Sequence, residues 1–144
     1  MQTIKVKQGE DVRIVGFGAT IDKATAAEQI GALWQRAAMA GKLREGEPSY
    51  AAYLDYEDRL ANRYRVVVGA ASDAPVQEGE EEVILPAGDY AVFSAKGPAA
   101  VVAKEAWQQV WTKSAEPRRF EVDFERYRGT PEASELELFV GVEG

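Results

Sequence analysis

Apolar and polar residues follow two periods along the chain, and these periods predict its elements. In RRFEVDFERY, residues 118–127, apolar and charged side chains alternate, which is typical of a strand with one apolar and one charged face. Around Trp34 and Trp107, apolar residues recur at helical spacing instead. The patterns predict helices at about 25–40 and 98–114, and strands at 12–20, 49–57, 64–72, 89–97, 118–127 and 135–143.

Both predicted helices carry signals at their ends. Thr25 and Glu28 have the spacing of a capping box, in which two side chains satisfy backbone N–H groups of the first turn. Pro98 stands in the first turn of the second helix, where its missing N–H costs nothing. The two helices are therefore predicted independently of the strands.

The order strand, helix, strand, strand occurs twice, which indicates an internal repeat. Aligning the halves sets Trp34 beside Trp107, Gly69 beside Gly141 and Tyr50 beside Phe120. We predict a single α+β domain over residues 1–144, with repeats at about 10–72 and 81–144 and a linker at about 73–80. Such a duplicated β-α-β-β module with pseudo-twofold symmetry should form a mostly antiparallel sheet with two long helices on one side.

Alternation also predicts which side chains face the helices. The apolar set is Phe120, Val122 and Phe124 on one strand and Leu136, Leu138, Val140 and Val142 on the next. The opposite face then holds Glu121, Asp123, Tyr53 and Phe139. Carboxylates mixed with aromatic rings favour a groove on that face, although scattered apolar residues on a solvated face would look the same.

The tryptophans have two readings as well. Trp107 and Trp111 are four residues apart and share one side of the second helix, so one of them could reach the edge of a cleft between the helices. Tryptophans at helical spacing are more often part of a core than of a ligand-binding surface.

Composition excludes several kinds of chemistry. The chain has no cysteine and no histidine, which removes disulfides, thiol nucleophiles, ordinary zinc sites and imidazole bases, and we expect no cofactor or metal. A net charge of −7 disfavours nucleic acid and favours cations. No apolar run approaches the roughly 18 residues of a membrane span, and no signal peptide is evident. We expect a cytoplasmic protein.

One stretch resembles a known family. LPAGDYAVFSAKGPAAVVAKEAWQQVW, residues 85–111, is similar to the middle motif of the GyrI-like small-molecule-binding domains, the effector-binding domains of AraC and MerR-type transcription regulators. RRFEVDFERY resembles the family's "fEvY" strand, and ELELFVGVE its closing strand. The resemblance implies a duplicated β-α-β-β module with a cleft for lipophilic, often cationic, molecules.

The resemblance also implies a site. In multidrug-sensing members an acidic residue of the "fEvY" strand meets the ligand's positive charge inside an aromatic box, and Glu121 matches it here. The tyrosine expected two places later is replaced by Asp123. The candidate walls are the aromatic residues Phe17, Tyr50, Tyr53, Tyr90, Phe93, Trp107 and Trp111.

Three functions follow as expectations. The leading one is a stand-alone domain, without a helix-turn-helix, that binds hydrophobic cationic compounds and works alone or with a separate transcription or gyrase partner protein. The second is an inhibitor of the DNA gyrase-inhibitor type that acts by protein interaction. The third is a small hydrolase in which Glu121 acts as base and Tyr50 or Tyr53 orients a water.

Overall fold

The computed structural model describes residues 2–41, 43, 46–57, 62–113, 118–130 and 132–142, without the side chains of 2–8, 100 and 111–113. This part of the chain forms β1 (Gln2–Gln8), β2 (Val12–Asp22), the 3-10 turn η1 (Lys23–Thr25), α1 (Ala26–Met39), β3 (Ser49–Leu54), β4 (Arg63–Ala71), β5 (Glu81–Leu85), β6 (Gly88–Gly97), α2 (Ala99–Lys113), β7 (Val122–Thr130) and β8 (Ala133–Gly141).

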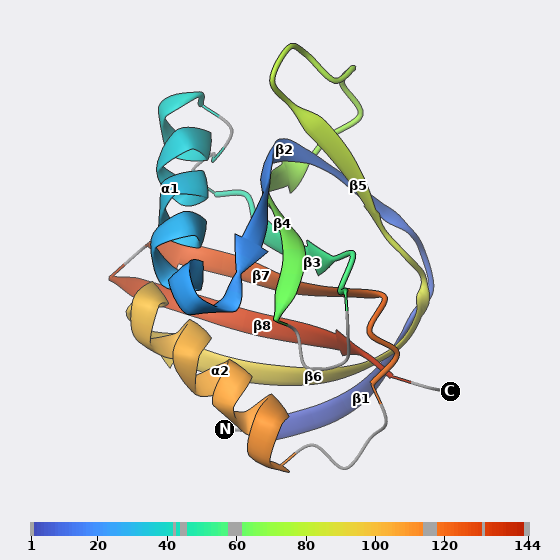
Figure 1. The fold of residues 1–144 in the computed structure, drawn as a ribbon. Coiled ribbons are helices and arrows are strands. Elements are labelled where there is room, and N and C mark those ends of the chain that lie inside the picture. The colour runs from blue at the N-terminus through green and yellow to red at the C-terminus, as the bar shows by residue number, and fades with distance from the viewer. Residues whose placement is uncertain are drawn as a thin grey trace.

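The eight described strands form one antiparallel sheet in the order β1-β6-β8-β7-β3-β4-β2-β5. At the centre of the sheet β7 pairs with β3. Outward from this pair, the strands follow in the order β8, β6, β1 on one side and in the corresponding order β4, β2, β5 on the other. Both helices lie on one face of the curved sheet (Figure 1). The predicted α+β fold with two related halves is confirmed.

Each half contains one strand more than predicted. β1 pairs with β6 and β5 pairs with β2, so each additional strand lies on the edge of the other half of the sheet. Their sequences, QTIKVKQ and EEVIL, are short and rich in charge. An edge strand needs fewer apolar residues than a central one, and alternation alone did not predict either.

The register of the central strands defines which residues of the two halves are equivalent. With Gly69 aligned on Gly141 as predicted, Tyr53 pairs with the residue three before Gly69, and Glu125 pairs with the residue three before Gly141. In this alignment Tyr53 and Glu125 are equivalent, and both lie on the two central strands of the sheet. Tyr50 then corresponds to Val122, so the predicted match of Tyr50 with Phe120 disagrees by two residues with the predicted match of the glycines.

The strand predicted from residue 118 begins only at Val122. Phe120 has a φ of +56°, which a strand cannot continue through. Before it, Arg118 forms a single isolated bridge with Val142. The alternation of RRFEVDFERY is thus interrupted by a backbone turn that the pattern does not reveal.

The start of α1 is also built differently from the prediction. Thr25 makes no capping bond with its side chain. Instead the Gln29 Oε1 atom accepts hydrogen bonds from the Asp22 backbone and the Thr25 hydroxyl, and Gln29 Nε2 donates to the Thr20 carbonyl. Gln29, and not a Thr25–Glu28 capping box, therefore links the first turn of α1 to the end of β2.

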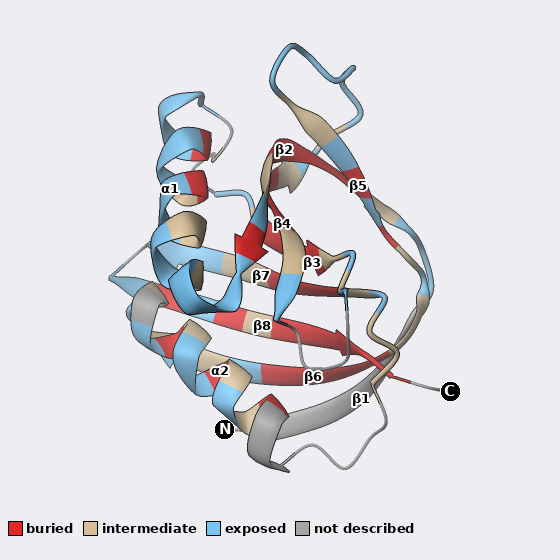
Figure 2. Ribbon diagram, in the orientation of Figure 1, coloured by how far each residue is buried: buried red, intermediate tan, exposed pale blue. Residues whose placement is uncertain are grey.

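The sheet is buried on both faces. On the helix side, α2 covers a cluster that includes Phe93, Leu136, Leu138 and Val140, and α1 covers one that includes Phe17, Ile21, Tyr53 and Val68. On the other face the sheet curls around its own core, which includes Ile14, Tyr50, Tyr90, Phe124 and Phe139. Figure 2 shows buried residues along the strands and exposed ones on the outer sides of the helices.

Four predicted face assignments are wrong as a result. Leu136, Leu138, Val140 and Val142 face the helix side as predicted. Val122 and Phe124 lie on the opposite face, and Tyr53 and its cross-strand partner Asp123 lie on the helix side. The register explains the error, because cross-strand partners share a face and Glu125, not Phe124, pairs with Leu138. The acidic side of β7 therefore points toward the helices.

Two glycines allow β2 and β4 to approach closely. Gly16 pairs with Gly69, and a Cβ atom built on Gly69 would lie 2.1 Å from the carbonyl oxygen of Val15. No side chain fits at that distance, so glycine is required where these two paired strands come this close.

Candidate functional site

A cleft of about 1400 Å³ opens between α1 and α2. Helix α1 packs on β2 and β4, and α2 packs on β6 and β8, so the central strands β3 and β7 lie in the gap between the helices. Small residues of both helices border the gap, namely Ala26, Ala27, Gly31, Ala38, Ala99 and Ala103. The duplicated architecture thus places one large cleft near its own symmetry axis.

Six aromatic side chains line this cleft: Trp34, Tyr53, Tyr56, Tyr64, Trp107 and Tyr127. The ring centroids of Tyr53 and Trp107 are 5.0 Å apart, and Trp34 meets Tyr127 edge-on at 5.2 Å. Tyr64 lies 5.8 Å from Tyr53. The rings hold one another in a continuous wall rather than standing singly in solvent.

Glu125 is the carboxylate of this wall. Its side chain points into the cleft from β7, although the residue is only 1% exposed. It accepts hydrogen bonds from Trp107 Nε1 at 2.7 Å, from the Tyr127 hydroxyl at 2.9 Å and from the Tyr53 hydroxyl at 3.0 Å. A carboxylate buried among aromatic rings is thereby oriented by three donors.

Burial dominates the acid–base properties of this group. Loss of solvation raises the pKa of Glu125 above its ordinary value, and the hydrogen bonds from Trp107, Tyr127 and Tyr53 oppose that rise in part. Burial, reinforced by the carboxylate, also raises the pKa of Tyr53 and Tyr127 far above that of a free tyrosine. Both tyrosines therefore remain protonated donors at any physiological pH.

Asp123, the other carboxylate on this side of β7, is fully buried and held by different partners. It accepts hydrogen bonds from the Tyr56 hydroxyl at 2.6 Å, from Arg118 Nη2 at 2.8 Å and from the Gly141 amide at 2.8 Å. The Arg118 guanidinium also stacks over Phe120 at 4.2 Å. The charge of Asp123 is thus compensated within the protein, and Arg118, not Asp123, lines the cleft.

The structure brings together only part of the predicted site. Tyr53 and Trp107 line the cleft, while Tyr50 and Tyr90 belong to the core on the other face of the sheet. Phe93 packs under α2, and Phe17 is buried against α1 with the Arg36 guanidinium 4.4 Å above its ring. The side chain of Trp111 lies outside the described residues.

The predicted acidic residue, Glu121, is exposed and does not line the cleft. The prediction that it is sheltered among aromatic rings is wrong, because Glu121 precedes β7 and adjoins Phe120, where the chain turns. Asp123, the other carboxylate predicted to bind ligand, is buried and bound to Arg118 and does not line the cleft.

A signal for the correct residue was present in the same stretch. Phe124-Glu125-Arg126-Tyr127 fits the pattern Phe-Glu-x-Tyr completely, whereas Phe120-Glu121 has aspartate where the tyrosine is expected. The fitting copy lies four residues further along. The tyrosine of that copy, Tyr127, is one of the three donors to Glu125.

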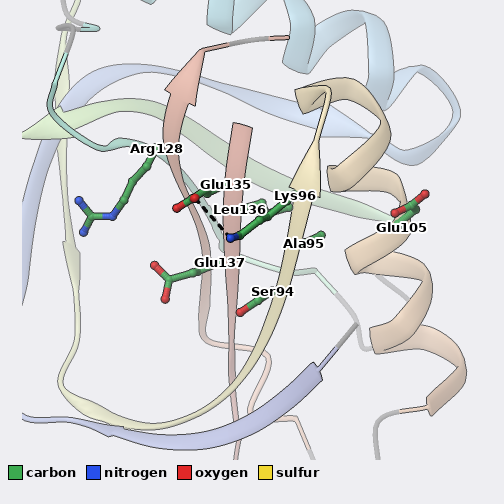
Figure 3. A pocket seen from close by; sticks show the side chains of 8 residues that line it. All are labelled: Ser94, Ala95, Lys96, Glu105, Arg128, Glu135, Leu136 and Glu137. Carbon is green, nitrogen blue, oxygen red and sulfur yellow. Dashed lines mark ion pairs between the residues drawn. The ribbon is translucent and has the colours of Figure 1, made fainter. Parts of the chain in front are cut away.

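A smaller hollow of about 630 Å³ lies along β6 and β8 and is shown in Figure 3. Its main interaction is an ion pair between Lys96 and Glu135, whose side chains are 81% and 59% exposed. It contains charged groups in contact with water but no sheltered one. The cleft between the helices is therefore the better candidate site.

Two other kinds of site are absent from the part of the chain that the structure describes. No three acidic side chains there are grouped so that they could hold a metal ion. Neither described helix combines the length and apolarity that crossing a bilayer requires.

Comparisons with known proteins agree on the fold. A family model described as Cass2, integron-associated effector binding protein, matches residues 5–142. An integron cassette protein from the mobile metagenome of Vibrio cholerae superimposes with a TM-score of 0.79 at 23% identity, covering 96% of this chain and 95% of that one. SAV2435 bound to tetraphenylphosphonium gives 0.77 at 18% identity, with 100% and 95% covered. Among curated proteins there is no significant match.

Proposed function

Because the chain belongs to the Cass2 family of integron-associated effector binding proteins, whose model spans nearly all of it, we propose that its cleft binds lipophilic cations through Glu125. Small-molecule binding is the function of the family, and the GyrI-like effector-binding fold predicted from the sequence is confirmed. The proposal concerns the finer points, which are the charge of the ligand and the residue that meets it.

The observation that carries the proposal is one buried carboxylate within an aromatic wall. Keeping an ionised carboxylate out of water is costly, and its raised pKa reflects that cost. A ligand cation would supply the missing opposite charge. A neutral or anionic ligand would leave the cost in place or increase it, so the site discriminates by charge.

Shape requirements on such a ligand are loose. Each contact between a cation and a ring face contributes roughly 0.5–2 kcal/mol, and burial of apolar surface contributes about 25 cal/mol per Å², less the losses of association. Neither contribution depends on a fixed hydrogen-bond geometry. The cleft is therefore suited to several bulky cations rather than to one substrate.

A structural relative supports the same ligand class. SAV2435 has this fold and is bound to tetraphenylphosphonium, a bulky aromatic cation without hydrogen-bond donors. A cleft of about 1400 Å³ lined by six aromatic side chains is large enough for a ligand of that size.

The other two predicted functions gain less support. Hydrolysis with Glu121 as base loses its geometric basis, because that carboxylate is exposed and does not line the cleft. Inhibition of gyrase through a protein contact remains a prediction that no described feature tests.

Titration with tetraphenylphosphonium tests the proposal. Glu125→Gln should weaken binding about tenfold or more, because a hydrogen bond or ion pair to a charged group is worth roughly 1.5–3 kcal/mol. Glu121→Gln is the matched control, since it removes an equal charge from the exposed end of the same segment, and it should bind like the parent. Equal affinities of both variants and the parent would contradict the role of Glu125. No binding to the parent would contradict the ligand class.

A further inference from the structure

We infer that the preferred ligand is amphoteric, carrying an anionic group at the end opposite its cation. The inference rests on the proposed function, because it extends the ligand from Glu125 toward the rim of the same cleft. It is carried by the distribution of charge around the cleft, which differs from that of the whole chain.

The lining is basic although the protein is acidic. The whole chain has 17 basic and 24 acidic residues, whereas the described residues that line the cleft include four basic and two acidic ones. Of these, Arg118 is bound to Asp123, and Glu125 is the buried carboxylate. Arg128 also lines the smaller hollow, together with Glu135 and Glu137 (Figure 3). Among the described residues, the exposed charges that remain at the rim of the cleft alone are those of Lys23 and Lys104 on the positive side and Glu47 on the negative side.

Within the described part of the chain, the rim lysines have no carboxylate partner. Most other described cations are paired within 4 Å: Arg13 with Glu82, Arg63 with Asp22 and Glu57, Arg65 with Glu81, Lys96 with Glu135 and Arg126 with Glu137. Arg36 and Arg119 lie over the rings of Phe17 and Tyr90 instead. Among the described side chains Lys23 and Lys104 form no such pair. In a protein with excess acid, cations left over at one cleft are available to an anion from outside.

The two rim lysines belong to different elements that border the same space. Lys23 opens η1 ahead of α1, and Lys104 lies on α2. A ligand that reaches from the buried carboxylate to the rim therefore passes from negative to positive surroundings. Its complement is a molecule with a cation at the inner end, an aromatic body and a carboxylate, sulfonate or phosphate at the outer end.

Because both lysines are exposed, each contributes only modestly and its contribution is screened by salt. The rim should then adjust the preference among cationic ligands rather than determine whether they bind. Removing the rim charges and removing Glu125 consequently have different expected effects.

Two matched dyes test the inference. Rhodamine 110 carries a free carboxylate on the phenyl ring that projects from its ring system away from the charge-bearing amino groups, and rhodamine 123 is its methyl ester and lacks that negative charge. At low salt rhodamine 110 should bind about fivefold more tightly, as expected for two exposed ion pairs. The double substitution Lys23→Gln and Lys104→Gln should abolish this preference and leave rhodamine 123 affinity within about twofold. Lys96→Glu changes the net charge equally at a site away from the cleft, and it should preserve the preference.

The outcomes separate the inference from the proposed function. Equal affinity for the two dyes, or tighter binding of rhodamine 123, would overturn the amphoteric class while leaving cation binding intact. A preference for rhodamine 110 that survives in the double variant would overturn its assignment to these lysines. If neither dye binds the parent protein, both the inference and the proposed function are contradicted.

Discussion

Tyr53 donates a hydrogen bond of 3.0 Å to Glu125. When the repeats are aligned on Gly69 and Gly141, these two residues occupy equivalent positions in the two halves. The two residues lie on β3 and β7, which pair at the centre of the sheet. The carboxylate of one half is thus held by the phenol of the other. Trp107 and Tyr127 complete the arrangement from the second half alone.

Trp107→Phe should shift the acid–base behaviour of the site while keeping an aromatic wall. The substitution removes the 2.7 Å hydrogen bond to Glu125, which favours the ionised form. We expect the pH midpoint of cation binding to move upward by about one unit, since a hydrogen bond to a charged group is worth roughly 1.5 kcal/mol. Fluorescence titration at several pH values measures the midpoint.

Trp34→Phe is the matched control for that experiment. Trp34 meets Tyr127 edge-on, and no hydrogen bond from its indole to Glu125 is found. Its substitution should lower affinity slightly through lost contact area without moving the midpoint. Equal midpoints for the parent and Trp107→Phe would show that the Trp107 hydrogen bond does not tune Glu125.

Cation affinity should depend on pH through Glu125. Since burial raises the pKa of Glu125 above its ordinary value of 4.5, the carboxylate takes up a proton at a higher pH than exposed acids do. Affinity should therefore be highest well above the raised pKa and should fall, by up to about tenfold per pH unit, as the pH drops below it. Isothermal titration calorimetry with tetraphenylphosphonium across pH 4.5 to 8 measures the dependence, and Glu125→Gln should show none of this component.

The same pKa shift has the opposite sign for the stability of the ligand-free protein. Between the unfolded pKa and the raised folded pKa, the folded state binds more protons than the unfolded state. The contribution of Glu125 to the free energy of unfolding therefore falls as the pH rises through this window. Urea unfolding of the parent and of Glu125→Gln over that window gives the contribution by difference, and a contribution that rises with pH would contradict the assignment.

Asp123→Asn should destabilise the fold without acting through the ligand. The substitution removes the counter-charge of Arg118, whose side chain is 12% exposed, and breaking a buried pair in this way costs about 3 kcal/mol or more. Urea unfolding at pH 7 measures the change. Glu121→Gln, on the exposed residue two positions earlier, should stay within about 0.5 kcal/mol of the parent. Similar losses in both variants would argue against a structural role specific to Asp123.

Two glycines should respond to alanine in opposite directions. A Cβ atom on Gly69 would clash with the backbone of Val15 at 2.1 Å, so Gly69→Ala should cost several kcal/mol of unfolding free energy or prevent folding. Gly31 lies within α1 with no atom within 4 Å of its built Cβ atom. Gly31→Ala should therefore stabilise the protein by about 0.5–1 kcal/mol. Thermal unfolding measures the stability of both variants. An unchanged stability of Gly69→Ala would contradict the close approach of the paired strands β2 and β4.

The sequence predicted elements better than it predicted faces. Both helices were located to within one residue at each end, because their apolar spacing is unambiguous, and six strands were located because they are apolar enough. The edge strands β1 and β5 were missed, since an edge position does not require a long apolar run. The turn at Phe120, which has a positive φ, could not be predicted either, because the alternation of apolar and charged residues continues through it.

The site was predicted as a kind of environment but at the wrong residue. A carboxylate among aromatic rings was expected and is present, yet it is Glu125 and not Glu121. The mistake arose because the family pattern was matched to the incomplete copy at Phe120–Asp123 and not to the complete copy four residues later. Alternation could not choose between them, since residues four apart lie on the same face of a regular strand. The face of β7 that meets the helices is set by register, here the pairing of Glu125 with Leu138, and register is decided by contacts between distant parts of the chain.

The pairing of Tyr53 with Glu125 has a consequence for how a guest molecule enters. Two identical halves would present the same group twice, either as two acids repelling each other or as two phenols without an acid. Divergence of the halves gives the axis an acceptor on one side and a donor on the other. The cavity near the twofold axis therefore has two chemically different ends, and an elongated guest should bind in it in a single orientation.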